Sequence, residues 1–104
     1  MPNDREKNVL LIDYYGSLLT HHQNEILDEY YNNDLSMTEI AENLGISKSA
    51  VQDLIKRSLT QLNEYEKLLK LIEKDSKLNV VLDQMRSENN DLLNKYVKKI
   101  VKLK

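Results

Sequence analysis

The sequence predicts an all-α fold: a bundle of about five helices, with a long fourth helix and a C-terminal helical extension. The length of 104 residues suits one domain with a modest core. Only two glycines and one proline are present, which are too few turn-forming residues for a many-stranded sheet. Apolar residues recur every three or four positions along most of the chain, which is the spacing of a helix face.

The first two helices are predicted from their apolar spacing and from a cap between them. Apolar residues fall on one face of a helix over residues 4–19. Thr20 and Gln23 then have the spacing of a capping box, in which hydroxyl and amide satisfy backbone donors reciprocally. The second helix therefore begins after Thr20, and it is expected to end in the turn-forming residues 32–34.

The next two helices are predicted to meet at a sharp corner. Ser36 and Glu39 form a second capping box, which opens a short helix. Gly45 ends that helix, because glycine accepts a positive φ without steric cost. Ser47 is placed to cap the following helix, whose apolar stripe is expected to run on to Ile72.

The C-terminal third predicts a separate helical segment. The polar run 74–77 is expected to bend or interrupt the long helix. Apolar residues at helical spacing over 80–101 predict a fifth helix, with residues 87–91 its weakest stretch. We therefore expect a helix-turn-helix domain over residues 1–73 and a basic C-terminal helix over 74–104 that belongs to the same folded unit.

The composition excludes several classes of function. Cysteine is absent, which excludes disulfides, thiolate metal ligands and cysteine nucleophiles and suits a reducing cytoplasm. The apolar run 9–12 is too short for a signal peptide or a bilayer span, so we expect a cytoplasmic protein without membrane insertion. His21 and His22 point about 100° apart on a helix, so we expect no metal site. No glycine-rich phosphate loop or nucleophile elbow occurs, so we expect no enzymatic activity and no cofactor.

Charge is distributed unevenly along the chain. The net charge of −2 argues against nucleic-acid binding by bulk electrostatics alone. Residues 1–35 carry two basic and seven acidic side chains, whereas residues 63–104 carry ten basic and seven acidic ones. Any binding to a polyanion must therefore use local basic surfaces in the middle or at the end of the chain.

Residues 37–57 have the residue types that a helix-turn-helix requires. Ala41 is small at the point where the two helices meet, and Gly45 turns the chain. Five apolar residues are expected to close the core of the motif: Ile40, Leu44, Ile46, Val51 and Leu54. The outward face of the second helix is then polar and partly basic, as in helices that enter a DNA groove.

We predict eight DNA-binding residues on and beside this face: Thr38, Ser47, Lys48, Ser49, Gln52, Asp53, Lys56 and Arg57. Hydroxyls and backbone N–H groups at the helix start can donate to phosphate oxygens. Gln52 can pair with an adenine edge, and Lys56 and Arg57 can neutralise phosphates or reach guanine. The alternatives are a helical corner whose polar face is only solvated, or a surface that docks a protein.

Four lysines place positive charge on one face of the last helix: Lys95, Lys98, Lys99 and Lys102. They form a candidate second nucleic-acid patch, although they could also touch an anionic membrane or complement the helix dipole. Residues 62–101 offer more apolar positions than a helix hairpin alone needs. Either the tail folds back over the first helices or it pairs with a second subunit, and we expect a homodimer.

Residues 35–51, LSMTEIAENLGISKSAV, resemble the fourth conserved region of bacterial sigma factors. Together with residues 11–20, LIDYYGSLLT, they make the chain similar to the YlxM family of small bacterial helix-turn-helix proteins, over roughly residues 5–75. The resemblance implies a sigma-factor-like DNA-binding fold and a regulatory role in the signal recognition particle pathway. DNA is therefore the expected partner. The alternative is a non-enzymatic adaptor that binds signal recognition particle RNA or protein through the basic C-terminal helix.

Overall fold

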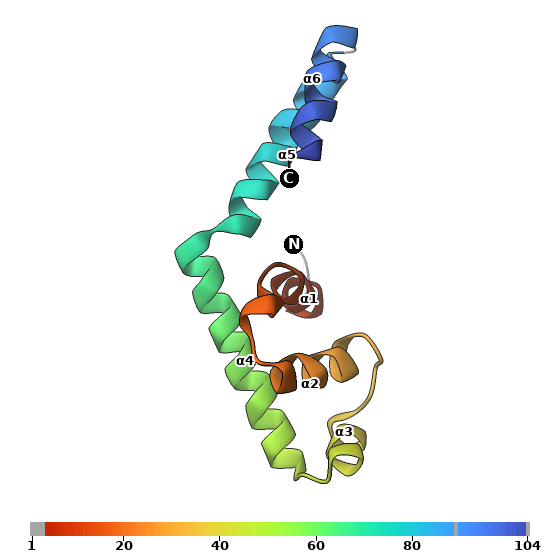
Figure 1. Ribbon diagram of the computed structural model, residues 1–104, viewed down its shortest axis with the longest axis vertical. Helices are drawn as coiled ribbons and strands as arrows, with labels where there is room; N and C mark the ends of the chain where they lie inside the picture. Colours follow the sequence, from red (N-terminus) through yellow and green to blue (C-terminus); the bar gives the residue numbers. More distant parts are fainter. Residues whose placement is uncertain (1–3, 89, 104) are drawn as a thin grey trace. The chain divides into compact units, whose positions relative to one another are not determined.

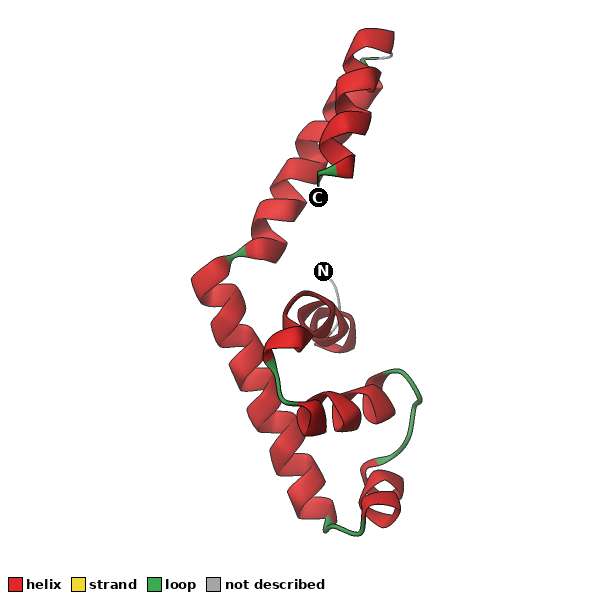
Figure 2. Ribbon diagram, in the orientation of Figure 1, coloured by secondary structure: helices red, strands yellow, loops and turns green. Residues whose placement is uncertain are grey.

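A computed structural model describes residues 4–88 and 90–103 of the chain. These residues form helices joined by short loops and contain no strand (Figures 1 and 2), so the predicted all-α class is confirmed. The elements are α1 (Asp4–Tyr15), the 3-10 turn η1 (Gly16–Leu18), α2 (His21–Tyr31), α3 (Met37–Leu44), α4 (Lys48–Leu69), α5 (Leu71–Ser87) and α6 (Asp91–Lys102). They form two compact units, Met1–Lys70 and Leu71–Lys104. The predicted division after residue 73, within one cooperatively folded unit, stays a prediction.

The long fourth helix ends earlier than the sequence predicts. α4 stops at Leu69, and Lys70 takes a left-handed conformation with φ 56° while its N–H donates to the Glu66 carbonyl at 2.8 Å. The polar run 74–77, where we expected the break, is helical and lies inside α5. Lysine is a good helix former, and an ion pair of 3.1 Å between Lys77 and Glu73 supports the helix at this point.

The predicted fifth helix is in fact two helices. Its weakest stretch, 87–91, contains the break between α5 and α6. Asn90 caps α6, since its Oδ1 accepts from the N–H groups of Leu92 and Leu93 at 2.9 and 3.1 Å. This side chain offers the backbone an alternative to continuing the helix, which explains why the chain turns here.

The first unit is built around α4, against which α1, α2 and α3 pack (Figure 1). Its core consists of large side chains from all four helices and the loop after η1: Leu11, Tyr15, Leu19, Ile26, Leu27, Tyr31, Ile40, Val51, Ile55 and Leu62. The Tyr15 hydroxyl donates to the Glu66 carboxylate, which links α1 to the last turns of α4. α1, α2 and α3 thus each have one face on α4, and α2 also contacts both α1 and α3.

Both predicted capping boxes are present. Thr20 caps α2 with Gln23, and Ser36 caps α3 with Glu39, each with the reciprocal side-chain and backbone hydrogen bonds. The first helix is shorter than predicted, because η1 tightens the chain at Gly16. Gly16 is buried, its carbonyl accepts from Asn24 at 2.8 Å, and a Cβ there would meet the Asn24 side chain at 3.2 Å. A larger residue would push η1 away from α2.

The N-terminal helix is fastened to the end of α2. Arg5 donates to the Tyr31 carbonyl and to the Asp34 carboxylate, both at 2.7 Å. Asn8 donates to the Tyr31 hydroxyl at 3.1 Å, and burial raises the pKa of this phenol above its ordinary value. These contacts hold α1 beside the C-terminal end of α2.

The second unit is a hairpin of α5 and α6 that buries little of its own apolar surface. Among its described residues, Leu82 and Val97 are the buried apolar ones. Seven large apolar residues of the hairpin are exposed: Leu71, Val80, Val81, Leu92, Tyr96, Val101 and Leu103. None of the described helices is long and apolar enough to cross a membrane.

Candidate nucleic-acid interface

The predicted corner between α3 and α4 is present. Gly45 has φ 68° and ψ 31°, and the N–H groups of Gly45 and Ile46 both donate to the Ala41 carbonyl. Apart from Gly45 and its two chain neighbours, no described residue has an atom within 4 Å of the position that a Cβ on Gly45 would occupy. Glycine is therefore favoured here by its backbone conformation and not by lack of space.

The core of the motif differs in part from the predicted one. Ile40, Ala41 and Val51 are buried as expected, since their exposed fractions are at most 6%. Leu44, Ile46 and Leu54 are only half-buried, and Ile55 fills the interior in their place. The reason is that α4 also packs on α1 and α2, which favours the stripe that contains Ile55 over the one that contains Leu54.

All eight predicted DNA-binding residues are exposed. Thr38 lies in the first turn of α3, and the other seven occupy the cap and the first three turns of α4. The buried residues of this half of α4, Val51, Ile55 and Ser58, lie on another side of the helix. The corner therefore presents one continuous polar face, from Ser47 to Arg57, to the solvent.

An internal ion pair reduces the positive charge of this face. Arg57 Nε lies 2.9 Å from Asp53 Oδ2, and both side chains are more than 60% exposed. Within the described residues, Lys48 and Lys56 have no acidic partner. The face therefore carries two unneutralised lysines and one arginine that shares its charge with a neighbouring carboxylate.

The start of α4 carries no acidic side chain. Ser47 caps it, with its Oγ accepting from the Ala50 N–H at 3.0 Å, and the residue in the capping-box position is alanine instead of glutamate. α3, by contrast, has Glu39 in its first turn. Because α4 is 22 residues long and its N-terminal partial charge is uncompensated, this end favours an anion.

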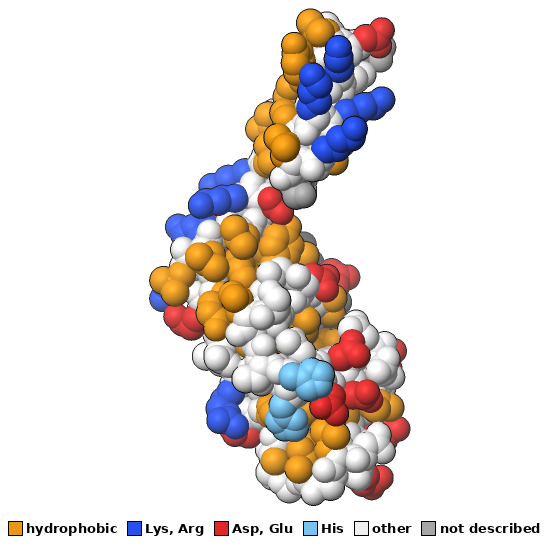
Figure 3. Space-filling model, in the orientation of Figure 1, with side chains coloured by type: hydrophobic (Ala, Val, Ile, Leu, Met, Phe, Trp, Pro, Cys, Tyr) orange, Lys and Arg blue, Asp and Glu red, His pale blue; other side chains and the backbone are white. Residues whose placement is uncertain are grey.

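A groove beside the polar face was not predicted from the sequence. It has a volume of about 570 Å³ and lies between the start of α2 and the middle of α4, lined by Thr20, His22, Gln23, Leu54, Arg57, Thr60 and Gln61. Figure 3 shows both histidines exposed on one side of this unit. Gln23 Nε2 donates to Ser58 Oγ at 3.1 Å and to Gln61 Oε1 at 2.6 Å, which joins the two helices under the groove. The sequence marked Thr20 and Gln23 as a cap, but only the packing of α2 on α4 brings them beside Arg57.

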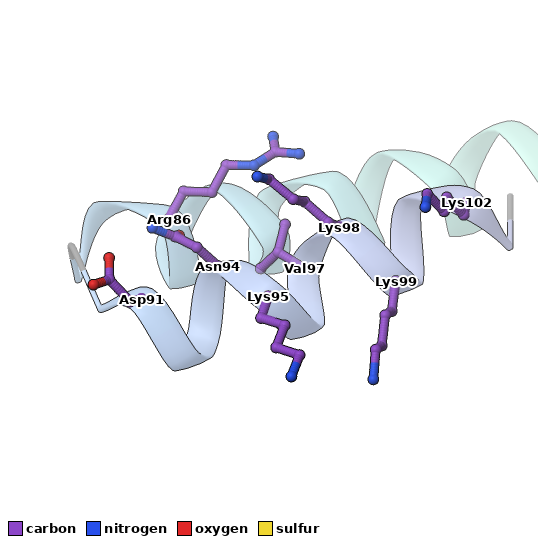
Figure 4. A pocket seen from close by; sticks show the side chains of 8 residues that line it. All are labelled: Arg86, Asp91, Asn94, Lys95, Val97, Lys98, Lys99 and Lys102. Carbon is purple, nitrogen blue, oxygen red and sulfur yellow. The ribbon is translucent and has the colours of Figure 1, made fainter.

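The candidate second patch lies on the hairpin. Lys95, Lys98, Lys99 and Lys102 are all exposed on α6 and line one groove (Figure 4). Arg86 of α5 lines the same groove, although the spacing of the lysines did not point to it. Its position in the last turn of α5 could have suggested this, but only the pairing of α5 with α6 brings it to the lysines.

The described residues contain no group of three or more histidine, aspartate or glutamate side chains placed to hold a metal ion. His21 and His22 accordingly line two different hollows, one with acidic neighbours on α2 and one beside Arg57. The chemistry offered by these surfaces is hydrogen bonding and charge.

Comparison with known proteins identifies relatives over nearly the whole chain. Residues 3–103 match the model of the UPF0122 family, described as "Putative helix-turn-helix protein, YlxM / p13 like". A UPF0122 protein of Clostridium perfringens is 43% identical over 94 residues, which cover 88% of this chain and 84% of the relative. A UPF0122 protein of Malacoplasma penetrans is 40% identical over 97 residues, or 91% of each chain. A UPF0122 protein of Acetivibrio thermocellus is 54% identical over 65 residues, 62% of this chain and 56% of the relative.

Proposed function

Because the chain belongs to the UPF0122 family of YlxM- and p13-like helix-turn-helix proteins, we propose that it is a non-enzymatic, DNA-binding regulatory protein of the cytoplasm. The first three turns of α4 enter the major groove. The observation that carries the proposal is the exposure of all eight predicted contact residues on the outward side of the corner. A helix-turn-helix that binds DNA needs this arrangement, with one helix buried on its inner side and polar on its outer side.

The contacts divide into positioning and reading. Backbone N–H groups at the start of α4, together with the hydroxyls of Thr38 and Ser49, bind phosphate oxygens. Gln52 lies one turn further along and reads a base edge, for which adenine is the geometric match. Lys56 lies one turn beyond Gln52 and neutralises the backbone.

Arg57 has a position between two surfaces. It lies on the polar face of α4 and also lines the groove at the start of α2, which has no acidic residue in its first turn. A phosphate in this groove would contact both the guanidinium and the partial positive charge of the α2 N-terminus. To do so, it competes with Asp53 for the guanidinium.

Affinity is expected to be modest at physiological salt. The face has few cations, one of them is paired with Asp53, and the net charge of the chain is −2. Nonspecific binding by such a surface falls in the micromolar range or weaker, on the order of 10⁻⁴ to 10⁻⁶ M. Specific binding then depends on the base contacts of α4 or on a second DNA-bound subunit.

Salt-dependent binding to a DNA duplex tests the proposal. Replacing both basic residues, Lys56→Ala with Arg57→Ala, should weaken binding roughly tenfold. The negative slope of log K against log salt should become shallower by about two. Fluorescence anisotropy with a labelled duplex of roughly 20 base pairs, two helical turns, measures both quantities.

A matched control is available on the same chain. Lys67→Ala with Lys77→Ala removes the same charge, and Lys77 is ion-paired to a carboxylate four residues away as Arg57 is. The control should bind like the wild type. An equal loss of affinity in both double variants would mean that only net charge matters. Unchanged affinity of the Lys56→Ala, Arg57→Ala variant would contradict DNA binding by the α4 face.

The homodimer is the second part of the proposal. The hairpin exposes half or more of the side chains of Val80, Leu92 and Tyr96, which is more apolar surface than an isolated hairpin of this size needs to expose. Pairing of two copies would cover it and would give one molecule two α4 helices, as in proteins that bind paired half-sites.

The adaptor function stays the alternative. It assigns binding of signal recognition particle RNA or protein to the basic end of the chain, and the free lysines of α6 favour it. Deleting residues 95–104 separates the two functions, because the adaptor would lose its partner whereas DNA binding by α4 would persist.

A further inference from the structure

The α5–α6 hairpin contains the most concentrated positive charge of the described chain. Five cations and one carboxylate line a single groove of about 730 Å³: Arg86, Lys95, Lys98, Lys99, Lys102 and Asp91, together with Asn94 and Val97. Asp91 lies in the first turn of α6, where an acid stabilises the positive end of the helix dipole. Asp91 is also four residues before Lys95, whereas Lys98, Lys99 and Lys102 have no acid within four residues of them on α6.

α5 and α6 each contribute a cation to the same edge of the groove. Figure 4 shows the guanidinium of Arg86, from α5, and the ammonium of Lys98, from α6, converging over the same edge of the groove, while Lys95 and Lys99 project from the other side of α6. Like charges that converge in this way raise the free energy of the unbound hairpin, and an anion between them lowers it. The arrangement therefore favours a ligand that carries negative charge.

Most of these cations are not neutralised within the protein. Arg86 has one ion pair, with Asp83 at 3.3 Å, and Lys99 lies 5.5 Å from the centre of the Tyr96 ring. Within the described residues, Lys95, Lys98 and Lys102 have no ion pair. The groove thus presents three free ammonium groups and a guanidinium whose carboxylate contact is a long one at the surface.

The lining and the spacing identify the class of ligand. Among the described residues that line the groove, Val97 is the only apolar one, whereas pockets for small molecules are mostly apolar. Lys95 and Lys102 are seven residues apart, or about 10 Å along the helix axis. A nucleic-acid duplex carries one phosphate charge per about 1.7 Å of its axis, so several phosphates lie within that span and can contact several cations at once.

We propose that the groove between α5 and α6 binds the phosphate backbone of a nucleic acid, as a second site separate from the α4 face. Arg86 and Lys98 form its centre, Lys102 lies further along α6, and Lys95 and Lys99 line its other side (Figure 4). The contacts are to backbone phosphates and carry no base specificity. Because the site is independent of the helix-turn-helix, the hairpin adds affinity and salt dependence without changing the preferred sequence.

The test uses the full chain and a double substitution that keeps both side chains long and polar, Arg86→Gln with Lys98→Gln. Both residues are exposed, so the helical circular dichroism spectrum should not change. Binding to a labelled DNA duplex and to an RNA duplex of the same sequence is measured between about 50 and 200 mM KCl. We expect roughly tenfold weaker binding and a salt slope lower by about two, with the larger loss identifying the preferred backbone.

The control is Lys74→Gln with Lys77→Gln, on α5 but outside the groove. It removes the same charge from the same hairpin, and again one of the two residues is ion-paired. This control should bind both duplexes within about twofold of the wild type. An equal loss in control and groove variant, or no loss in the groove variant, overturns the inference.

Two further measurements distinguish the groove from a membrane-binding surface and from the α4 face. Co-sedimentation with phosphatidylglycerol vesicles overturns the inference if the groove variant loses vesicle binding and keeps duplex binding. The Lys56→Ala, Arg57→Ala variant is measured in parallel: if it binds like the wild type while the groove variant is weakened, the proposed function of α4 fails and the groove stands. The reverse result retains α4 and removes the groove.

Discussion

The two units of this chain differ in how much of their apolar surface they bury. The first unit encloses Tyr15, Ile26 and Leu62, among others, with exposed fractions of 1% or less. Over its described residues, the hairpin encloses two apolar side chains and exposes seven large ones. A unit with a filled core keeps its surface residues in a fixed geometry. A hairpin with so small a core has low stability of its own, and a bound partner would stabilise it.

This difference corresponds to the functions that we propose for the two units. Reading bases requires α4 to be held rigidly, and three helices pack against it. Contacting phosphates requires only charge at suitable spacing, which two paired helices supply. The hairpin can therefore be less stable than the first unit and still bind a nucleic acid.

The largest expected effect comes from the same substitution made in each unit. Leu62→Ala should lower the free energy of unfolding of the first unit by about 3 kcal/mol, because Leu62 is fully buried in its core. Leu82→Ala should unfold the hairpin alone. Amide resonances of each unit, followed by NMR during urea denaturation, report the two free energies separately. Loss of stability in the first unit on Leu82→Ala would instead support the predicted single folded unit.

The next effect concerns the exposed apolar face of the hairpin. Leu92→Ser with Tyr96→Ser should weaken homodimer formation by about 2 kcal/mol, roughly 30-fold in Kd, because each side chain is half-exposed or more in the single chain. Sedimentation equilibrium gives the Kd. Leu68→Ser with Leu10→Ser, which alters exposed leucines of the first unit, is the control. A monomeric wild type at all accessible concentrations would contradict the homodimer.

A smaller effect is expected at the corner. Gly45→Ala should destabilise the first unit by about 1 kcal/mol, because alanine is disfavoured at a φ of 68°. No steric clash adds to this cost, since the added Cβ would have open space around it. Gly45→Asn should cost less, since asparagine adopts this conformation more readily. Thermal unfolding measures both. Equal stability of wild type and Gly45→Ala would show that the left-handed turn is not required.

The smallest effect tests the charge balance of the α4 face. Asp53→Asn should strengthen nonspecific duplex binding by about threefold, because it frees Arg57 from its ion pair and removes a negative charge from the interface. Anisotropy at low salt measures the change. Weaker binding would mean that Asp53 positions Arg57 for its contact and does not compete with the phosphate.

Local features of the first unit could be predicted from the sequence. Both capping boxes, the corner at Gly45 and the exposure of the recognition face follow from neighbouring residues, because caps and turns depend on side chains three or four positions away. The preference for Ile55 over Leu54 in the core could not be predicted. It depends on how α1 and α2 pack on α4, which no local pattern reveals.

The C-terminal third was predicted less well for a physical reason. α4 ends at Lys70, a lysine with φ 56°, and left-handed conformations are uncommon for lysine, so no sequence pattern marked this end. The polar run 74–77 has good helix propensity and continues α5. Arg86 joined the basic groove only once α5 and α6 were paired. The sequence pattern predicted the lysine cluster of α6, because these residues are neighbours on one helix. It could not predict that Arg86 of another helix packs beside them.

Chemical shift mapping of the full chain with a DNA duplex tests the central claim most directly. We expect the largest shifts of backbone amides at residues 47–57 and at Thr38, saturating together and disappearing as salt is raised. Shifts in the hairpin would report the second site without affecting this result. Saturable binding that leaves the amides of residues 47–57 unchanged would contradict the proposed role of α4.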